Sequence, residues 1–181
     1  GPLPRGDEPL SVMIWTTTPW TLPGNRAVAV HPDLRYAVVA LHTSEGVTRT
    51  VLADQRVEPV LSAVQEKRGD WLLSYEVERY VGGRELVDGG YTYVHPLDPQ
   101  RTCPVVEAPY VTVEDGTGLV HTAPGHGLED YQTGLRCGLE IACPVGPDGR
   151  FDRGAPEFLH GVDVWEGKQR VTGNEHPTQK P

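Results

Sequence analysis

Residues 35–53 read RYAVVALHTSEGVTRTVLA, and this stretch decides the fold class. Its two apolar runs, Arg35–Leu41 and Val47–Ala53, lie on either side of residues 43–46 (TSEG), where the glycine suits a turn. Short apolar runs bounded by turn-forming residues are typical of β-strands. The stretch therefore predicts a β-hairpin.

The same pattern of short apolar runs and turns continues in both directions along the chain. It predicts further strands at Ser11–Trp15, Arg26–Val30, Trp71–Val81, Tyr91–Val94, Val105–Val106, Tyr110–Val113, Leu119–Thr122 and Ile141–Val145. One stretch has helical spacing instead, because apolar residues recur at intervals of three and four from Val57 to Val64. This helix is expected to begin between Asp54 and Glu58 and to end near Gly69.

A second short helix is expected at Leu128–Cys137. Its first turn contains two acidic residues and Gly138 follows its last residue, as in many helices. Many short strands with two short helices predict a mainly β fold. We expect a closed β-barrel core with a few short peripheral α-helices.

Composition excludes several classes of protein. The 181 residues include 21 glycines and 17 prolines, which disfavours long helices and coiled coils. Hydrophobic residues make up 38%, too many for a disordered chain. The longest apolar runs, such as Ala37–Leu41, are far too short to cross a membrane, and no secretory leader is recognisable. We therefore expect a soluble domain with no membrane partner.

Charge and cysteine content narrow the choice of partners. Lys and Arg total 16 against 25 Asp and Glu, which gives a net charge of −9. This charge disfavours binding along a nucleic acid, although the end of a strand could still bind locally. The cysteines, Cys103, Cys137 and Cys143, include no C-x-x-C pair, so a zinc site is poorly supported. We expect no metal, no cofactor and a reducing, cytoplasmic environment.

Three regions are expected along the chain. Residues 1–10 are turn formers and charges that predict a flexible lead-in, and Gly1-Pro2 resembles the remnant of a protease cleavage. This start predicts a piece excised from a longer protein. Residues 11–165 are expected to form the folded domain, and residues 166–181 a loose polar segment.

The first segment whose side chains suit binding or catalysis is Trp15–Asn25, WTTTPWTLPGN. Thr16, Thr17 and Thr18 place three hydroxyls at the end of an expected strand, which Pro19 stops. Such a group of donors and acceptors suits a binding site. The alternative is that the threonines only favour a pleated backbone.

The second segment is Gly116–Tyr131, GTGLVHTAPGHGLEDY. An expected strand places His121 near its C-terminal end, and small residues after it would let a ligand approach the backbone before the helix begins. Asp130, in the first helical turn, would direct a carboxylate to the same opening, where free N–H groups suit an anion or an ester oxygen. The alternatives are a histidine satisfied within its strand and an acid that only stabilises the helix dipole.

These two segments closely resemble the editing domain, connective peptide 1, of bacterial isoleucyl-tRNA synthetase. The resemblance covers most of residues 11–150, including Ala27–Pro32 (AVAVHP) and Pro144–Gly149 (PVGPDG). Valyl and leucyl relatives typically have arginine in place of Thr18, so Thr18-Pro19-Trp20 resembles the isoleucyl branch. The His-Ile-Gly-His and Lys-Met-Ser-Lys-Ser signatures of the synthetic site are absent from this sequence, which implies editing without aminoacylation.

The resemblance implies hydrolysis of valine wrongly esterified to the 3′ end of tRNA(Ile), and of valyl-adenylate, within a complete synthetase. One methylene group discriminates poorly in a binding pocket, so a second, editing site is needed. Asp130 would pair with the substrate α-ammonium. His121 and residues 16–18 would line a pocket that admits valine and excludes isoleucine.

The remaining site residues implied by the resemblance shape the pocket or lie near the ester. Trp15, Trp20 and Asn25 would bound the pocket, and the backbone of Ala123, Pro124, Gly125 and His126 would lie near the adenosine or the ester. For catalysis we expect a water held by threonine hydroxyls, chiefly Thr18, and by the free ribose hydroxyl, while Asp130 orients the ester. An adjacent ammonium lowers a carboxyl pKa, so Asp130 is a poor general base.

Two other functions remain open at this point. A free-standing deacylase that edits tRNA in trans would use the same chemistry. A non-catalytic module that binds tRNA or a protein partner would retain the fold with a decayed pocket, which the intact threonine run and Asp130 disfavour.

Overall fold

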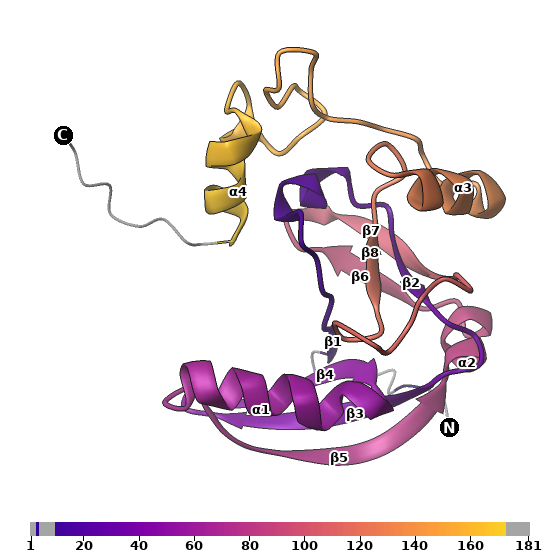
Figure 1. The fold of residues 1–181 in the computed structure, drawn as a ribbon, viewed down its shortest axis with the longest axis vertical. Helices are drawn as coiled ribbons and strands as arrows, with labels where there is room; N and C mark the ends of the chain where they lie inside the picture. The colour runs from indigo at the N-terminus through magenta and orange to yellow at the C-terminus, as the bar shows by residue number, and fades with distance from the viewer. Residues whose placement is uncertain (1–2, 4–9, 173–181) are drawn as a thin grey trace. The chain divides into compact units, whose positions relative to one another are not determined.

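The computed structural model describes residues 3 and 10–172 of the chain (Figure 1). The chain divides into two compact units. Unit 1 comprises Gly1–Trp15, Val28–Tyr93 and Pro104–Val120, and unit 2 comprises Thr16–Ala27, Val94–Cys103 and His121–Pro181. The expected lead-in, apart from Leu3 and Leu10, and the C-terminal segment beyond residue 172 lie outside the described residues.

The hairpin expected within residues 35–53 is confirmed and lies at the centre of unit 1. Strands β3 (Arg35–Thr43) and β4 (Gly46–Ala53) are antiparallel, and Thr43 pairs with Gly46. Gly46 has a φ of 125°, a backbone conformation that disfavours any residue with a side chain. Strand β5 (Leu72–Gly82) pairs with β3, and β1 (Leu10–Val12) runs parallel to β4, which gives the order β1-β4-β3-β5.

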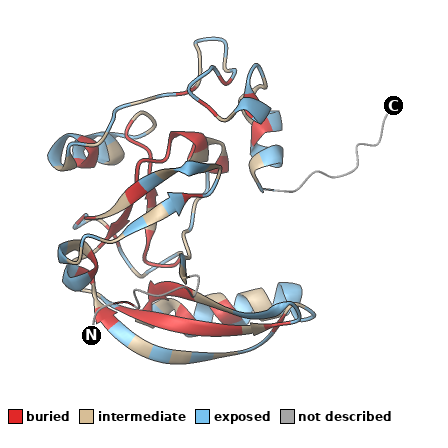
Figure 2. Ribbon diagram, turned by 180° about the vertical axis from the view of Figure 1, so that it is seen from behind, coloured by how far each residue is buried: buried red, intermediate tan, exposed pale blue. Residues whose placement is uncertain are grey.

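The position of each strand in this sheet explains its burial (Figure 2). β3 lies between two strands and is buried from Tyr36 to Leu41. β5 lies at an edge, and its exposed positions alternate with less exposed ones, as expected for a sheet with one solvated face. Helix α1 (Val57–Arg68) follows a 3-10 turn at Asp54–Arg56 and packs on the sheet through Leu61, so this expected helix is confirmed.

A second sheet has the order β6-β7-β2-β8. Its strands are β6 (Thr92–His95), β7 (Asp98–Glu107), β2 (Ala27–Val30) and β8 (Val120–Thr122), with β2 parallel to β7. Both sheets are open over the described residues, so the prediction of a closed β-barrel is wrong. Barrel closure needs edge strands that pair along their length, and β1, β6 and β8 have only three or four residues each. The coarser expectation, sheets with a few helices, is confirmed.

Several local predictions also differ from the structure. Residues 110–113 are irregular because the Val111 N–H donates to the Ala108 carbonyl in a turn, and residues 141–144 are irregular up to a bridge between Val145 and Phe151. Two helices were not expected: α2 (Gly83–Asp88) and α4 (Val164–Thr172). A Glu85 carboxylate that accepts the Gly82 N–H stabilises the start of α2. The polar stretch after Trp165 therefore begins as a helix, where a loose segment was expected.

The elements of unit 2 that matter for the site are short. The 3-10 helix η1 (Pro19–Gly24) follows the threonine run, and helix α3 (Leu128–Cys137) has the bounds expected from the sequence. Gly138 ends α3 in the left-handed conformation, with φ 64°. A small apolar cluster around Phe151 also packs against Trp20, which follows the threonine run. Within residues 3 and 10–172, every helix is too short or too polar to cross a membrane.

Candidate active site

His121 lies at the centre of a buried hydrogen-bond network in unit 2. Strand β8 positions its ring, whose Nε2 lies 2.9 Å from the Thr21 hydroxyl and whose Nδ1 lies 2.7 Å from the Asn25 amide nitrogen. The same Asn25 nitrogen donates to the Ala27 carbonyl at 3.0 Å. Thr21 belongs to η1, so the network joins that helix to β8.

These contacts assign the protonation of the His121 ring. An amide nitrogen can only donate, so Nδ1 accepts from Asn25 and the ring proton lies on Nε2. Thr21 Oγ1 accepts a hydrogen bond from this Nε2–H group, and its hydroxyl donates a hydrogen bond to the Thr18 carbonyl at 2.8 Å. His121 is only 6% exposed, and burial, followed by the nearby His126 and His95, lowers its pKa from 6.5 to about 4. The ring is therefore neutral at physiological pH.

The threonine run has a fixed backbone and open hydroxyls. Thr16 Oγ1 accepts the Thr18 N–H at 3.1 Å, and the Thr18 carbonyl accepts from Thr21. Thr17 and Thr18 are exposed, and neither hydroxyl has a partner among the described residues. The segment therefore presents two free hydroxyls on a backbone that is held in place.

Asp130 joins the end of β8 to helix α3. Its Oδ2 accepts the Ala123 N–H at 2.8 Å, and its other oxygen has no donor within the described part of the chain. Burial raises the pKa of this carboxyl, the Ala123 hydrogen bond partly offsets that effect, and Glu129 raises the pKa further. A half-buried carboxylate with one open oxygen can bind a cation.

The rings of Trp20 and His126 pack edge to face, with centroids 5.2 Å apart. His126 Nδ1 lies 3.9 Å from the Cys143 sulfur, and its Nε2 is buried without a partner in the described residues. Gly24 allows this packing, because a Cβ there would lie 2.9 Å from the His126 ring. Burial, followed by Arg26, lowers the pKa of His126.

The small residues after β8 serve packing in this structure. Ala123 and Pro124 are buried, and a Cβ on Gly125 would lie 2.3 Å from the Ala142 carbonyl oxygen. The packing against Ala142 thus requires glycine at position 125, whether or not a ligand binds nearby. Trp15 is exposed and belongs to unit 1, where it contacts Gly116.

One residue of the network was not selected from the sequence. Thr21 is buried and connects His121 to Thr18, although nothing in its local pattern singled it out except its position three residues after Thr18. That spacing allows a hydroxyl to reach back to a carbonyl. The second partner, His121, is 100 positions away along the chain and could not be inferred from spacing.

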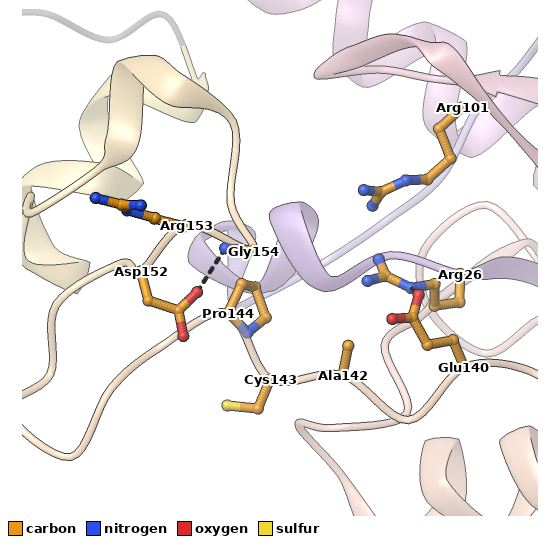
Figure 3. A pocket seen from close by; sticks show the side chains of 9 residues that line it. All are labelled: Arg26, Arg101, Glu140, Ala142, Cys143, Pro144, Asp152, Arg153 and Gly154. Carbon is orange, nitrogen blue, oxygen red and sulfur yellow. Dashed lines mark hydrogen bonds and ion pairs between the residues drawn. The ribbon is translucent and has the colours of Figure 1, made fainter.

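A cleft of about 660 Å³ in unit 2 adjoins this network (Figure 3). Arg26, Arg101 and Glu140 lie at one end of it, and Cys143, which contacts His126, also lines it. None of the site residues expected from the sequence lines this cleft. The sequence therefore did not indicate this cleft.

No family model matches the chain. Among curated proteins, it is 46% identical over 167 residues to the isoleucine–tRNA ligase of Thioalkalivibrio sulfidiphilus, covering 92% of this chain. It is 48% identical over 162 residues to the isoleucine–tRNA ligase of Halorhodospira halophila, covering 89% of this chain. In both comparisons the chain spans only 16% of the relative's length.

Solved structures with the same fold include GlLeuRS-CP1, with a TM-score of 0.66 and 16% identity over 98% of this chain and 87% of that one. The editing domain of P. knowlesi cytosolic leucyl-tRNA synthetase has a TM-score of 0.63 and 13% identity, covering 92% of this chain and 80% of that one. At these identities the likeness establishes the fold alone.

Proposed function

We propose that this chain, which belongs to the isoleucine–tRNA ligase family, is the proofreading domain of such an enzyme. It hydrolyses valine esterified to the 3′ end of tRNA(Ile), and valyl-adenylate, as part of a cytoplasmic synthetase. The observation that carries the proposal is the His121 network. Within one unit it holds the Thr18 backbone and the strand that leads to Asp130, the two places where a ligand would meet open polar groups.

Asp130 binds the α-ammonium of the misattached amino acid in this proposal. Its open oxygen supports that role, because Oδ2 is already occupied by the Ala123 N–H. An ammonium partner favours the ionised carboxylate and so opposes the effect of burial on the pKa. Asp130 therefore orients the ester and does not act as the general base.

Hydrolysis requires a water molecule to attack the ester carbonyl carbon, the bond from that carbon to the ribose oxygen to break, and a proton from the water to pass to the leaving ribose oxygen. The exposed hydroxyl of Thr18, with that of Thr17, holds this water, and the substrate's free ribose hydroxyl assists. The Thr16 and Thr21 hydrogen bonds fix the backbone from which these hydroxyls project. A fixed backbone limits the motion that would misplace the water.

His121 shapes the site without transferring protons. Both of its ring nitrogens are hydrogen-bonded, and its pKa of about 4 keeps it neutral. Held by Asn25 and Thr21, it forms a rigid wall of the side-chain pocket together with the threonine run. Trp20, which follows the threonine run, packs edge to face against His126. A rigid wall excludes the additional methylene of isoleucine, because packed interiors resist local expansion.

Single-turnover deacylation, with the chain in excess, tests the proposal. Valyl-tRNA(Ile) and isoleucyl-tRNA(Ile) are incubated separately, and the remaining ester is measured over time. We expect valyl-tRNA(Ile) to be hydrolysed about a hundredfold faster than isoleucyl-tRNA(Ile). Binding of tRNA with no acceleration of hydrolysis over buffer would instead support the non-catalytic module, and equal hydrolysis of both esters would refute the pocket.

A further inference from the structure

The cleft beside His126 carries two arginines that the proposed chemistry does not use. Arg26 precedes β2, and Arg101 belongs to β7. Figure 3 shows both guanidinium groups pointing into the same end of the cleft, whereas Arg153 points away from them. The carboxylates that also line the cleft are those of Glu140 and Asp152.

Arg26 is held in place with part of its hydrogen-bonding capacity unused. Its side chain is 9% exposed, its Nε donates to Glu140 at 2.9 Å, and its Nη1 donates to the Asn25 carbonyl at 2.9 Å. No acceptor contacts its Nη2 within residues 3 and 10–172. A buried guanidinium with an open donor at a cleft is preorganised for an anion.

Arg101 adds a second positive charge at the same place. Its Nη2 lies 3.3 Å from Asp98. Both arginines lower the pKa of the buried His95, after the larger effect of burial itself, so their fields overlap there. The carboxylate nearest to Arg26, that of Glu140, belongs to a side chain that is 70% exposed and strongly screened by water. An oxyanion bound between two guanidinium groups would offset their repulsion and occupy the open donors.

We propose that Arg26 and Arg101 bind a phosphate group of the nucleotide that carries the ester. This inference rests on the proposed function and adds a binding site to it. The site is continuous with the network, because Arg26 follows Asn25, which bonds His121, and Cys143 of the same cleft contacts His126. A net charge of −9 disfavours binding along a nucleic acid, but two converging arginines suffice for one strand end.

Two nucleotides could supply this phosphate: the 3′ end of tRNA through its phosphodiesters, or the adenylate through its single phosphate. Calorimetric titrations of the chain at low salt with CpCpA, with adenosine 5′-monophosphate and with adenosine distinguish them. Both phosphate-bearing ligands, or one of them, are expected to bind more tightly than adenosine. Preference for CpCpA assigns the site to the tRNA backbone, and preference for adenosine 5′-monophosphate assigns it to the adenylate.

The informative variant is Arg101→Gln, because Arg101 is only partly buried and its loss should leave the fold intact. This variant is expected to bind phosphate-bearing ligands about tenfold more weakly and to bind adenosine with unchanged affinity. The matched control, Arg136→Gln, removes the same charge from helix α3 outside the cleft and should change neither affinity. Arg101→Lys keeps the charge without the planar fork and should be intermediate.

Equal affinity for adenosine and the phosphate-bearing ligands, or wild-type affinity in Arg101→Gln, would overturn the phosphate site. Deacylation of valyl-tRNA(Ile) by the same proteins separates this failure from that of the proposed function. If the wild type deacylates but Arg101→Gln is unchanged in both assays, the function stands and the phosphate site is wrong. If the wild type does not deacylate, the function is wrong, while the titrations still decide whether the cleft binds phosphate.

Discussion

Unit 1 and unit 2 bury different kinds of side chain. The interior of unit 1 is almost wholly apolar, with Val38, Val39 and Leu52 fully buried around the sheet. Seven of the ten buried polar or charged residues in the described part of the chain belong to unit 2. His121, Asn25 and Thr21 are among them, and each is hydrogen-bonded.

The difference indicates that unit 1 mainly stabilises the fold and that unit 2 mainly positions polar groups. Apolar burial is non-directional and stabilises a fold without placing any atom accurately. Buried hydrogen bonds contribute modestly to net stability, but they have strict geometry and are costly to leave unsatisfied. Unit 1 is therefore expected to respond to lost volume, and unit 2 to lost hydrogen-bond partners and to pH.

The largest expected effect on stability comes from unit 1. Leu52→Ala leaves a cavity in a fully buried position and should destabilise the chain by about 2–5 kcal/mol in urea unfolding. Leu73→Ala, at an exposed position of β5, is the matched control and should change stability by less than about 0.5 kcal/mol. Similar losses in the two variants would show that unit 1 lacks the tightly packed core described above.

The next effect, in unit 2, depends on pH. The pKa of His121 is about 4 in the folded chain against 6.5 for the free side chain, so between these values the unfolded chain binds more protons. The resulting stabilisation is complete above pH 6.5 and is lost as the pH falls from 6.5 to 4, about 3 kcal/mol in all.

Urea unfolding at pH 7 and at pH 4.5 measures this loss. His121→Gln cannot titrate in this range and should lose correspondingly less stability on acidification than the wild type. An equal loss of stability in the wild type and in His121→Gln would mean that the surroundings of the His121 ring do not keep it neutral.

A smaller effect is expected where unit 2 packs closely. Gly125→Ala would place a Cβ 2.3 Å from the Ala142 carbonyl oxygen, so the backbone must shift, at a cost of about 1–3 kcal/mol. Gly127→Ser is the control, because a Cβ there makes only ordinary contacts, at 3.8–4.0 Å from Asp130, and serine suits the start of a helix. Thermal unfolding of both variants measures the difference in stability between them. Equal stability of the two variants would show that residues 142–143 move freely enough to accommodate the added Cβ.

The smallest stability effect is expected at the exposed threonines. Thr18→Val removes a hydroxyl without a partner in the described residues and should change stability by less than about 0.5 kcal/mol. Hydrolysis of valyl-tRNA(Ile) should nevertheless slow about tenfold, because the attacking water loses a partner. A large loss of stability with an unchanged hydrolysis rate per folded molecule would show that Thr18 has a structural role and does not hold the attacking water.

The sequence predicted those parts of the structure that depend on local patterns. Helix α3 has the expected bounds because its acidic first turn and Gly138 are local signals, and the β3–β4 hairpin follows from two apolar runs around one turn. Barrel closure was predicted wrongly because periodicity identifies strands but not which edges pair. The contacts of His121 with Thr21 and Asn25 span about 100 positions, so no local spacing reveals them.

The threonine run, His121 and Asp130 were selected from local sequence patterns, the other site residues were selected by resemblance, and the hydrogen bonds came from the structure. Asp130 was expected to face an opening, and its bond to Ala123 was not foreseen. The cleft that contains Arg26 and Arg101 has no sequence motif, because Arg26, Arg101 and Glu140 come from three distant segments. Such a feature depends on tertiary structure alone.

The most direct test of the account combines one variant with one change in the substrate. Asp130→Asn keeps an acceptor for the Ala123 N–H but removes the charge, and N-acetylation of valyl-tRNA(Ile) removes the ammonium. Each change alone should slow single-turnover hydrolysis about a hundredfold, and both together no more than either alone, because they remove the same contact. Glu129→Gln, on the exposed neighbouring acid, should behave as the wild type. Wild-type hydrolysis by folded Asp130→Asn, or losses that multiply, would contradict the pairing of Asp130 with the substrate ammonium.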